Sequence, residues 1–348
     1  VVVRPARADT GVLFVRGDLP DEDPVPATLA SLAEGDRRTL LKVGRAEVHT
    51  VEHLLGALTI LGIDNLEVEL DGPELPALDG SAVTWVELLR KATVVDLKAK
   101  RKVFVVERPF HVQLGKASLM AVPRDEPGLA LSYTLDYRGQ GLPPQIVEVD
   151  LTRDDAAKDI APARTFVFEQ EVEALREAGL GRGAVSGENT LVLTGTPEGA
   201  TVLDGELRFP DEPARHKLLD MLGDLFLLGA DIHGEIVALR SGHRAHHHLA
   251  QALLVAMEHE ETHGRLVRDT AMDVREISDL PRTLPGQSHH ARRPHSRGPG
   301  PAGWYLVAAP HGVHGQASRA LGHRQGQAAP LRGSRRPASA GGRGHQGA

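Results

Sequence analysis

This chain of 348 residues has no cysteine, and aromatic residues make up only 3% of it. The lack of cysteine excludes disulfide bridges and thiolate metal sites, so any metal ion must be held by histidine, aspartate or glutamate. No hydrophobic run is long enough to span a membrane, and the N-terminus has no basic flank followed by an apolar signal core. We therefore expect a cytoplasmic protein with no membrane span, long enough for two domains.

Acidic residues and lysine are absent from residues 286–348, which nevertheless contain nine arginines. The preceding 285 residues hold all 47 acidic residues and 31 basic ones, so the first part of the chain is acidic and the last part is basic. Residues 286–348 are rich in glycine, proline and alanine and poor in branched aliphatic residues, which predicts a disordered low-complexity tail. Because its arginines are not interleaved with aromatic residues, we expect no specific nucleic-acid partner.

Strand-like and helix-like segments alternate from the start of the chain to about residue 269. Their order predicts an α+β fold rather than a regular series of β-α-β units. Strands are expected at residues 11–16, 65–70, 102–113, 116–122, 129–137, 163–168, 190–195 and 235–240. Helices are expected at residues 51–61, 82–92, 169–177, 217–228 and 246–261.

The two halves of this region have similar contents: strands, a helix headed by a histidine-bearing segment, and another strand. This similarity predicts two related α+β domains, at residues 1–99 and 100–264. The boundary is expected near residues 98–102, where the basic sequence LKAKRK reads as an exposed connector.

The stretch RHKLLDMLGDLFLLG combines a buried-helix composition with a stripe of charge. His216, Asp220 and Asp224 are four residues apart, and Lys217 follows the first of them. At 100° per residue these side chains occupy about one quarter of the helix circumference, and the remaining arc is apolar. The stripe is either the polar wall of an internal cavity or a thin solvated strip.

The stretch HTVEHLLGAL places Glu52 and His53 off the apolar face of a predicted helix, in its first turn, with Thr50 as the expected N-cap. Hydrolytic zinc sites usually use three histidine or carboxylate ligands and leave a position for water. His216 and Asp220 supply two such ligands, and His53 would supply a third. Glu52 would then accept a proton from the water. The alternative is that each histidine is an ordinary core or surface residue.

The stretch SGHRAHHHL follows the last predicted strand. His243 is expected in a loop before the final helix, where its imidazole can protonate a leaving amine, and Asp224 can orient it. His246, His247 and His248 are predicted to form an exposed helix start and receive no role.

Together, several stretches resemble the zinc-dependent UDP-3-O-acyl-N-acetylglucosamine deacetylases of lipid A biosynthesis. The similar stretches run in family order across residues 1–262 and are HTVEHLLGAL, GIDNLEVELDGPELPALDGSA, ARTFVFEQEVEALREAGLGRGA, NTLVL, LRFPDEPARHKLLDMLGDLFLLG and SGH. The resemblance implies two similar sheet-on-helix domains with the active site between them. It also implies hydrolysis that releases acetate from a UDP-3-O-acyl-N-acetylglucosamine substrate by a protein that is monomeric.

The resemblance implies roles for individual residues. The zinc ligands are expected to be His53, His216 and Asp220, with Glu52 as general base. The general acid is expected to be His243, oriented by Asp224, and the groups that stabilise the oxyanion to be Thr165 and Lys217. A β-α-β insert near residues 166–193 is expected to receive the acyl chain. Candidate substrate contacts are Phe166, Val172, Leu175 and Leu180 for this chain, Arg240 for the diphosphate and Tyr137 for the uridine.

Two departures from the family pattern concern the ends of the chain. The family's N-terminal strand and its GxGLHSG-like loop are absent, which suggests a missing N-terminal piece. AMDVREISDL, at residues 271–280, resembles the opening of a 3-hydroxyacyl-carrier-protein dehydratase, so residues 265–285 are predicted to be a linker and a stump left by a frameshift or a gene-model error. The alternatives are a bifunctional deacetylase and dehydratase, or an inactive remnant that binds UDP-sugar or metal.

Overall fold

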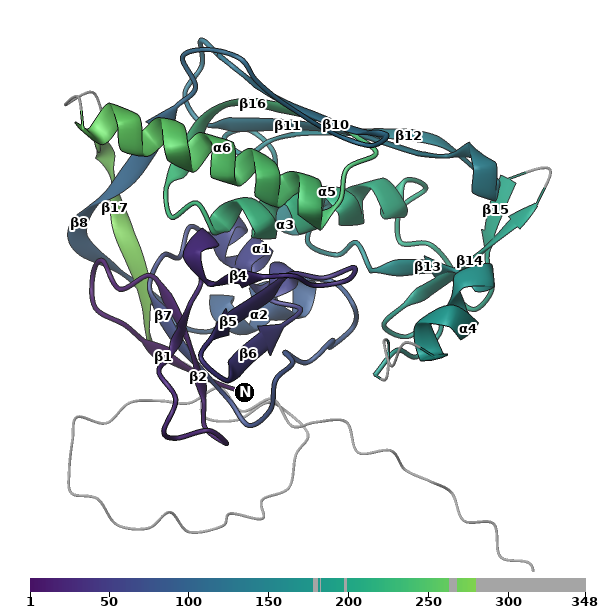
Figure 1. Ribbon diagram of the computed structural model, residues 1–348, viewed down its shortest axis with the longest axis horizontal. Helices are drawn as coiled ribbons and strands as arrows, with labels where there is room; N and C mark the ends of the chain where they lie inside the picture. Colours follow the sequence, from purple (N-terminus) through teal and green to yellow (C-terminus); the bar gives the residue numbers. More distant parts are fainter. Residues whose placement is uncertain (178–180, 182, 197–198, 263–267, 280–348) are drawn as a thin grey trace, which may run out of the picture. The chain divides into compact units, whose positions relative to one another are not determined.

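The computed structural model describes residues 1–177, 181, 183–196, 199–262 and 268–279. Within these ranges the predicted α+β class is confirmed, because helices pack on antiparallel and mixed sheets (Figure 1). Leu180 and the predicted tail at residues 286–348 lie outside the described residues. Among the helices that are described, none combines the length and the apolar character needed to cross a membrane.

The first half of the chain forms two small sheets. In spatial order, one contains β1 (Val2–Pro5), β7 (Leu66–Leu70), β2 (Val12–Arg16) and β3 (Val25–Pro26). The other contains β4 (Leu32–Ala33), β5 (Leu40–Val43) and β6 (Ala46–His49). Every second residue of β2 and β7 is buried, because alternate side chains of a strand point to opposite faces. The helices of this half are η1 (Leu29–Ser31), α1 (Glu52–Leu61) and α2 (Val83–Arg90).

The second half is organised around a seven-stranded sheet. Its continuous path is β12 (Leu142–Asp150), β11 (Leu129–Tyr137), β16 (Asp231–Leu239), β10 (Ala117–Val122) and β9 (Phe110–Leu114). β8 (Thr93–Val105) pairs with the first residues of β16, and β17 (Arg268–Asp279) pairs with β8. Two helices, α5 (Glu212–Phe226) and α6 (His243–Thr262), contact the same side of this sheet (Figure 1). The short helices are η2 (Arg138–Gln140) and α3 (Ala156–Asp159).

A smaller sheet lies beyond the end of α5 (Figure 1). It contains β13 (Phe166–Phe168), β14 (Leu191–Thr196) and β15 (Gly199–Val202). β13 and β14 are parallel and are connected through α4 (Glu169–Glu177), so this region forms a β-α-β unit.

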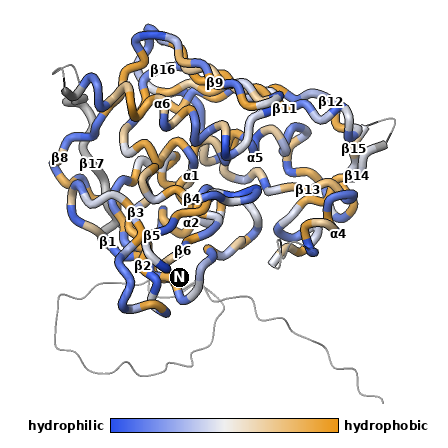
Figure 2. The backbone as a smooth tube through the Cα atoms, in the orientation of Figure 1, coloured by the Kyte–Doolittle hydropathy of each residue, from blue (hydrophilic) through white to orange (hydrophobic). Residues whose placement is uncertain are grey.

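Helices α1 and α5 pack against each other at the centre of the fold. Their backbones approach closely at Gly223, where an added Cβ would lie only 2.0 Å from the carbonyl oxygen of Glu52. Figure 2 shows apolar segments in α1 and along the strands, and hydrophilic segments in many of the connecting loops. The close approach places the first turn of α1 directly beside the middle of α5.

The structure places several predicted segments differently, each for a local reason. The connector at residues 98–102 belongs to β8, where lysines alternate on the exposed face while Arg101 is buried on the other. The strand at residues 102–113 is divided between β8 and β9. Helix α5 begins at Glu212 rather than at residue 217, since Pro213 is tolerated in a first turn where its missing N–H has no helical partner. Helix α6 begins at His243, so this residue is not in a loop.

Several elements were not predicted. Strand β12 has two exposed prolines at its start, and proline is tolerated there because β12 is an edge strand. Thr50 is not the N-cap of α1, because Val51 occupies that position and the Thr50 hydroxyl donates to Glu74. Part of the predicted linker, Arg268–Asp279, forms strand β17.

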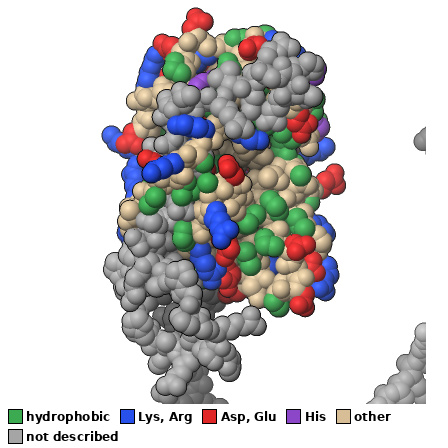
Figure 3. Space-filling view, turned by 90° about the vertical axis from the view of Figure 1, so that its left-hand side faces the viewer, with side chains coloured by type: hydrophobic (Ala, Val, Ile, Leu, Met, Phe, Trp, Pro, Cys, Tyr) green, Lys and Arg blue, Asp and Glu red, His purple; other side chains and the backbone are tan. Residues whose placement is uncertain are grey.

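Acidic and basic side chains are interspersed on the face of the molecule shown in Figure 3, with apolar side chains between them. Some of these opposite charges form exposed ion pairs on the described surface, for example Arg153 with Glu126. Such pairs contribute little to stability, so the fold depends on its buried contacts.

Candidate active site

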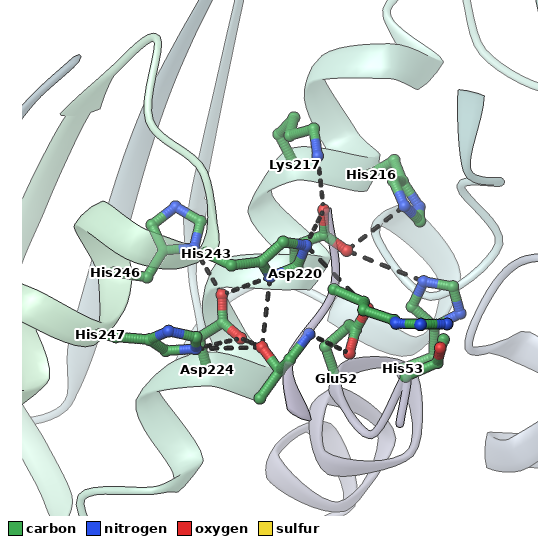
Figure 4. Close-up of polar contacts among 12 residues, drawn as sticks. Glu52, His53, His216, Lys217, Asp220, Asp224, His243, His246 and His247 are labelled. Atoms are coloured by element: carbon green, nitrogen blue, oxygen red, sulfur yellow. Dashed lines mark hydrogen bonds and ion pairs between the residues drawn. The ribbon is translucent and has the colours of Figure 1, made fainter. Parts of the chain in front are cut away.

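Three helices contribute polar side chains to one buried cluster, which Figure 4 shows in close-up. The labelled residues are Glu52 and His53 from α1, His216, Lys217, Asp220 and Asp224 from α5, and His243, His246 and His247 from α6. All of them are buried except Lys217, which is half-buried. The charged stripe of α5 is therefore the wall of an internal site and not a solvated strip.

His53, His216 and Asp220 form a compact group of metal-type ligands. The Asp220 Oδ1 atom lies 3.3 Å from His216 Nε2 and 3.7 Å from His53 Nε2. A tetrahedral ion 2.0–2.1 Å from each ligand would hold ligand atoms about 3.4 Å apart. Two imidazole nitrogens and one carboxylate oxygen at these separations fit a divalent ion of the zinc type.

The structure also orients the His216 ring. Its Nδ1 lies 3.0 Å from the carbonyl oxygen of Ala163. A carbonyl can only accept, so Nδ1 carries the proton and Nε2 presents its lone pair to the ligand group. The segment around Ala163 is itself anchored, because Arg164 forms a buried ion pair with Glu212 at the start of α5.

The charges of these three ligands suit metal binding. Burial lowers the pKa of His53 to about 3, and it also lowers the pKa of His216. Burial alone would raise the pKa of Asp220, but the neighbouring His216 and Lys217 hold it well below its usual range. All three groups are therefore in the deprotonated form that a metal requires.

Lys217 lies between the ligand group and an aromatic ring. Its Nζ donates to Asp220 Oδ2 at 2.8 Å and is 5.7 Å from the centroid of Phe166. Burial opposes the charged ammonium, but the Asp220 carboxylate raises the pKa of Lys217 above its ordinary value. The side chain thus remains a cation beside the site.

Glu52 is the first residue of α1 and is 3% exposed. Its Oε2 accepts the backbone N–H of Thr39 at 3.1 Å, and its Oε1 is 4.0 Å from His243 Nε2. Burial raises the pKa of Glu52 to about 7, with the nearby His243 acting in the opposite direction. The Glu52 carboxylate therefore lies beside His243, while the next residue, His53, contributes to the group of metal-type ligands.

His243 has one ring nitrogen on a carboxylate and the other facing the site. Its Nδ1 is 2.8 Å from Asp224 Oδ2, and its Nε2 is 3.8 Å from Asp220 Oδ2. Burial lowers the pKa of His243, but Asp224 and Asp220 outweigh burial and raise it to about 9. Asp224 is thus the partner of His243, as its place on α5 suggested.

The prediction of an exposed histidine triplet was wrong for two of its three members. His246 is fully buried and His247 is 8% exposed, whereas His248 is exposed. His246 Nδ1 lies 2.7 Å and His247 Nε2 lies 3.3 Å from the Asp224 carboxylate. The sequence did contain a clue to this. His246 and His247 are three and four residues after His243, and because α6 begins at His243, this spacing places all three on the same side of the helix.

Thr39 was also missed, and no sequence motif marks it. It lies just before β5 and is completely buried, and its hydroxyl donates a hydrogen bond to Asp224 Oδ1.

A second group of metal-type ligand atoms consists of Asp224, His243 and His246. Direct hydrogen bonds already join the two histidines to the Asp224 carboxylate.

The predicted acyl-chain and nucleotide contacts lie beside the cluster or farther away. The Phe166 ring packs edge-on against His216 at 6.5 Å and against Tyr137 at 6.1 Å. Val172 and Leu175 are half-buried on α4. Arg240 forms an ion pair with Asp136, the residue before Tyr137.

Thr165 precedes β13 and is held at both backbone groups. Its N–H donates to the carbonyl oxygen of Gly80, and its carbonyl oxygen accepts from Leu191. The next residue, Phe166, contacts His216, so Thr165 is close in sequence to the wall of the site.

Two comparisons with known proteins cover this part of the chain. A family profile described as UDP-3-O-acyl N-acetylglycosamine deacetylase matches residues 1–255. The UDP-3-O-acyl-N-acetylglucosamine deacetylase of Thermosynechococcus vestitus is 40% identical over 253 residues, which cover 73% of this chain and 86% of that protein. Every residue of the buried cluster lies within the range that the family profile matches.

Proposed function

Because the chain belongs to the UDP-3-O-acyl N-acetylglycosamine deacetylase family, we propose that it removes the acetyl group from a UDP-linked, 3-O-acylated N-acetylglucosamine. Water adds to the acetamide carbonyl, the C–N bond breaks, and acetate and the free 2-amine are released. The observation that carries this proposal is the convergence of three metal-type ligands with Glu52 and His243 in one buried cluster.

The proposed metal is zinc, held by His53, His216 and Asp220. The donor set and its separations support this choice, as does the proton on His216 Nδ1. When bound, the ion supplies Lewis-acid polarisation of the carbonyl and lowers the pKa of the attacking water.

Glu52 is the proposed general base. Its carboxylate is on the first turn of α1, next to a proposed ligand, and is held by the Thr39 N–H. From this position it takes the proton from the attacking water.

His243 is the proposed general acid. Asp224 accepts from Nδ1, which leaves Nε2 facing the cluster to deliver a proton to the departing nitrogen. The carboxylate also stabilises the imidazolium before that transfer.

Lys217 and Thr165 are the proposed groups for the negative charge that develops on the carbonyl oxygen. Lys217 keeps its positive charge next to Asp220, so it provides a fixed cation at the site. Thr165 would add its hydroxyl from the segment that precedes β13.

Phe166, Val172 and Leu175 are proposed to line the path of the acyl chain. Their support is the β-α-β unit beside the cluster, whose first residue packs on His216. Tyr137 and Arg240 are proposed contacts for the uridine and the diphosphate. They come from adjacent parts of the large sheet, where Arg240 pairs with Asp136.

A metal-content measurement coupled to an acetate-release assay tests the function. The purified chain is expected to hold about one zinc and to release acetate from the UDP-sugar. His216→Ala is expected to lose the bound metal and to reduce turnover by about two orders of magnitude or more.

The matched control is His248→Ala, because His248 is an exposed histidine on α6. This variant is expected to keep both zinc and turnover. A wild-type chain that binds zinc and UDP-sugar without releasing acetate would instead show an inactive remnant, and undiminished turnover in His216→Ala would refute the ligand assignment.

A further inference from the structure

Thr39 contacts the proposed base and the carboxylate that orients the proposed acid. Its backbone N–H donates to Glu52 Oε2 at 3.1 Å, and its hydroxyl donates to Asp224 Oδ1. Asp224 in turn accepts from His243 Nδ1 at 2.8 Å. One residue therefore joins the carboxylate of the proposed base to the carboxylate that orients the proposed acid.

The hydrogen-bond chemistry of this cluster determines where the protons lie. The Thr39 hydroxyl has one proton, which it gives to the Asp224 carboxylate, so it must accept from His247 Nε2 at 3.0 Å. His246 donates from Nδ1 to Asp224, which leaves its Nε2 to accept from the Ser241 hydroxyl at 2.9 Å. His246 thus has a hydrogen-bond partner on each ring nitrogen, and His247 presents its Nε2–H to the cluster.

The position of Thr39 is itself restrained by the first half of the chain. Its carbonyl oxygen accepts the N–H of Thr50 at 3.0 Å, two residues before Glu52. The side chain is completely buried and lies 185 residues from Asp224 in sequence. The residue is therefore tied through its backbone to the start of α1 and through its hydroxyl to α5.

We propose that Thr39 is a positioning residue that sets the Glu52 carboxylate and the Asp224–His243 pair in a fixed relation across the two halves of the molecule. This inference rests on the proposed function, because it assigns Glu52 and His243 to proton transfer. Thr39 does not contact the reacting atoms. It acts through the carboxylates of Glu52 and Asp224, and it supplies a hydroxyl donor that a hydrocarbon side chain cannot replace.

Replacement of the hydroxyl tests the proposal. Thr39→Val keeps the branched shape and the backbone N–H but removes the donor to a buried carboxylate. We expect kcat to fall about tenfold or more, with KM within about twofold and zinc content equal to that of the wild type. Thr39→Ser restores a hydroxyl and is expected to recover most of the lost kcat.

The matched control is Thr59→Val. Thr59 is also on the first half of the chain, but its hydroxyl donates to backbone carbonyls, that of Leu55 at 3.0 Å and that of Leu222 at 3.5 Å, and to no carboxylate. This variant removes one hydroxyl without altering the Asp224 cluster and is expected to retain wild-type kcat. If Thr39→Val does not fold, Thr39→Ala is compared with Thr39→Ser in the same assay.

A readout that does not depend on turnover is the NMR spectrum of ¹⁵N-labelled histidine rings. The wild type is expected to show a proton on His247 Nε2, and Thr39→Val to show a changed His247 resonance because the nearer of its two acceptors is gone and only Asp224 remains. A wild type without deacetylase activity would refute the proposed function alone, since the spectra still test the hydroxyl. Thr39→Val with wild-type kcat, or with unchanged histidine resonances, would overturn the role of Thr39.

Discussion

At the scale of single residues, Asp224 shows how a carboxylate stays ionised inside a protein. Burial by itself would raise its pKa, but the charge of His243 and the hydrogen bonds from three histidines hold the pKa well below the usual range. The Thr39 hydroxyl adds a further donor. Because each neighbour donates a proton to it, a protonated Asp224 would have no acceptor for its own proton.

Asp224→Asn tests whether His243 needs the negative charge of Asp224. The amide keeps the size of the side chain but replaces one acceptor oxygen with an NH₂ donor, which would face a hydroxyl or an imidazole that also donates. We expect kcat to fall by about two orders of magnitude, because His243 loses its anionic partner. Zinc content is expected to stay at the wild-type level, since the contacts of Asp224 are with Thr39 and the histidines of α6.

The measurements are steady-state kinetics and metal analysis on the same preparations. Loss of zinc from Asp224→Asn would show that the variant disturbs the ligand group. A kcat within about threefold of the wild type would show that the His243 partner does not need a negative charge.

At the scale of elements, the crossing of α1 and α5 decides whether the ligand group can form. His53 comes from α1, and both His216 and Asp220 come from α5, so the separation of the two helices sets the distance between the ligands. Gly223 permits that separation, because its missing side chain leaves room for the backbone of Glu52. The glycine is three residues beyond Asp220 and faces the first turn of α1.

Gly223→Ala is expected to force the helices apart. Its Cβ would lie 2.0 Å from the Glu52 carbonyl oxygen, which is backbone and cannot rotate away. We expect the free energy of unfolding to fall by about 2 kcal/mol or more and zinc to bind more weakly, because His53 moves away from Asp220.

Denaturant unfolding and zinc titration measure the two effects. Gly139→Ala is the control, since a Cβ there has nothing within 4 Å and Gly139 is exposed. Its unfolding free energy and zinc affinity are expected to match those of the wild type. Equal zinc affinity in Gly223→Ala would contradict the dependence of the ligand group on the helix crossing.

At the scale of the whole molecule, Arg101 connects the two halves. It is 8% exposed, and its guanidinium donates to Asp64 and to the Gly62 carbonyl at the end of α1. A further bond reaches Asp231, the first residue of β16. The arginine thus ties the C-terminal end of a helix of the first half to the large sheet of the second.

Arg101→Met keeps the apolar stem and removes the charge. We expect the free energy of unfolding to fall by about 2 kcal/mol, because two half-buried carboxylates lose their partner. Since Arg101 is remote from the buried cluster, kcat and zinc content of the folded protein are expected to be unchanged.

Arg153→Met provides the comparison, because the Arg153 side chain is 61% exposed and pairs with Glu126 at the surface. Its effect on the unfolding free energy is expected to be within about 0.5 kcal/mol. Equal losses in the two variants, measured by urea denaturation, would show that the Arg101 contacts do not stabilise the junction.

Local spacing made much of the fold and part of the site predictable. The four-residue interval between His216 and Asp220 places both on one helix face whatever surrounds the helix, because helical geometry is a local property. The helices α1, α2, α4 and α5 were expected from the same periodicity, and the motifs of the chain pointed to its family. The sequence by itself therefore determined the class of fold and which helix faces carry the ionisable residues of the cluster.

The tertiary structure decided which of these faces meet and what surrounds them. Thr39 and Asp224 are 185 residues apart, and nothing in the local pattern of either residue shows that they touch. The burial of His246 and Arg101 also depends on elements distant in sequence, such as α5 and β16. Contacts of this kind follow from how closely helices and sheets pack, and that packing is a property of the assembled core rather than of any segment.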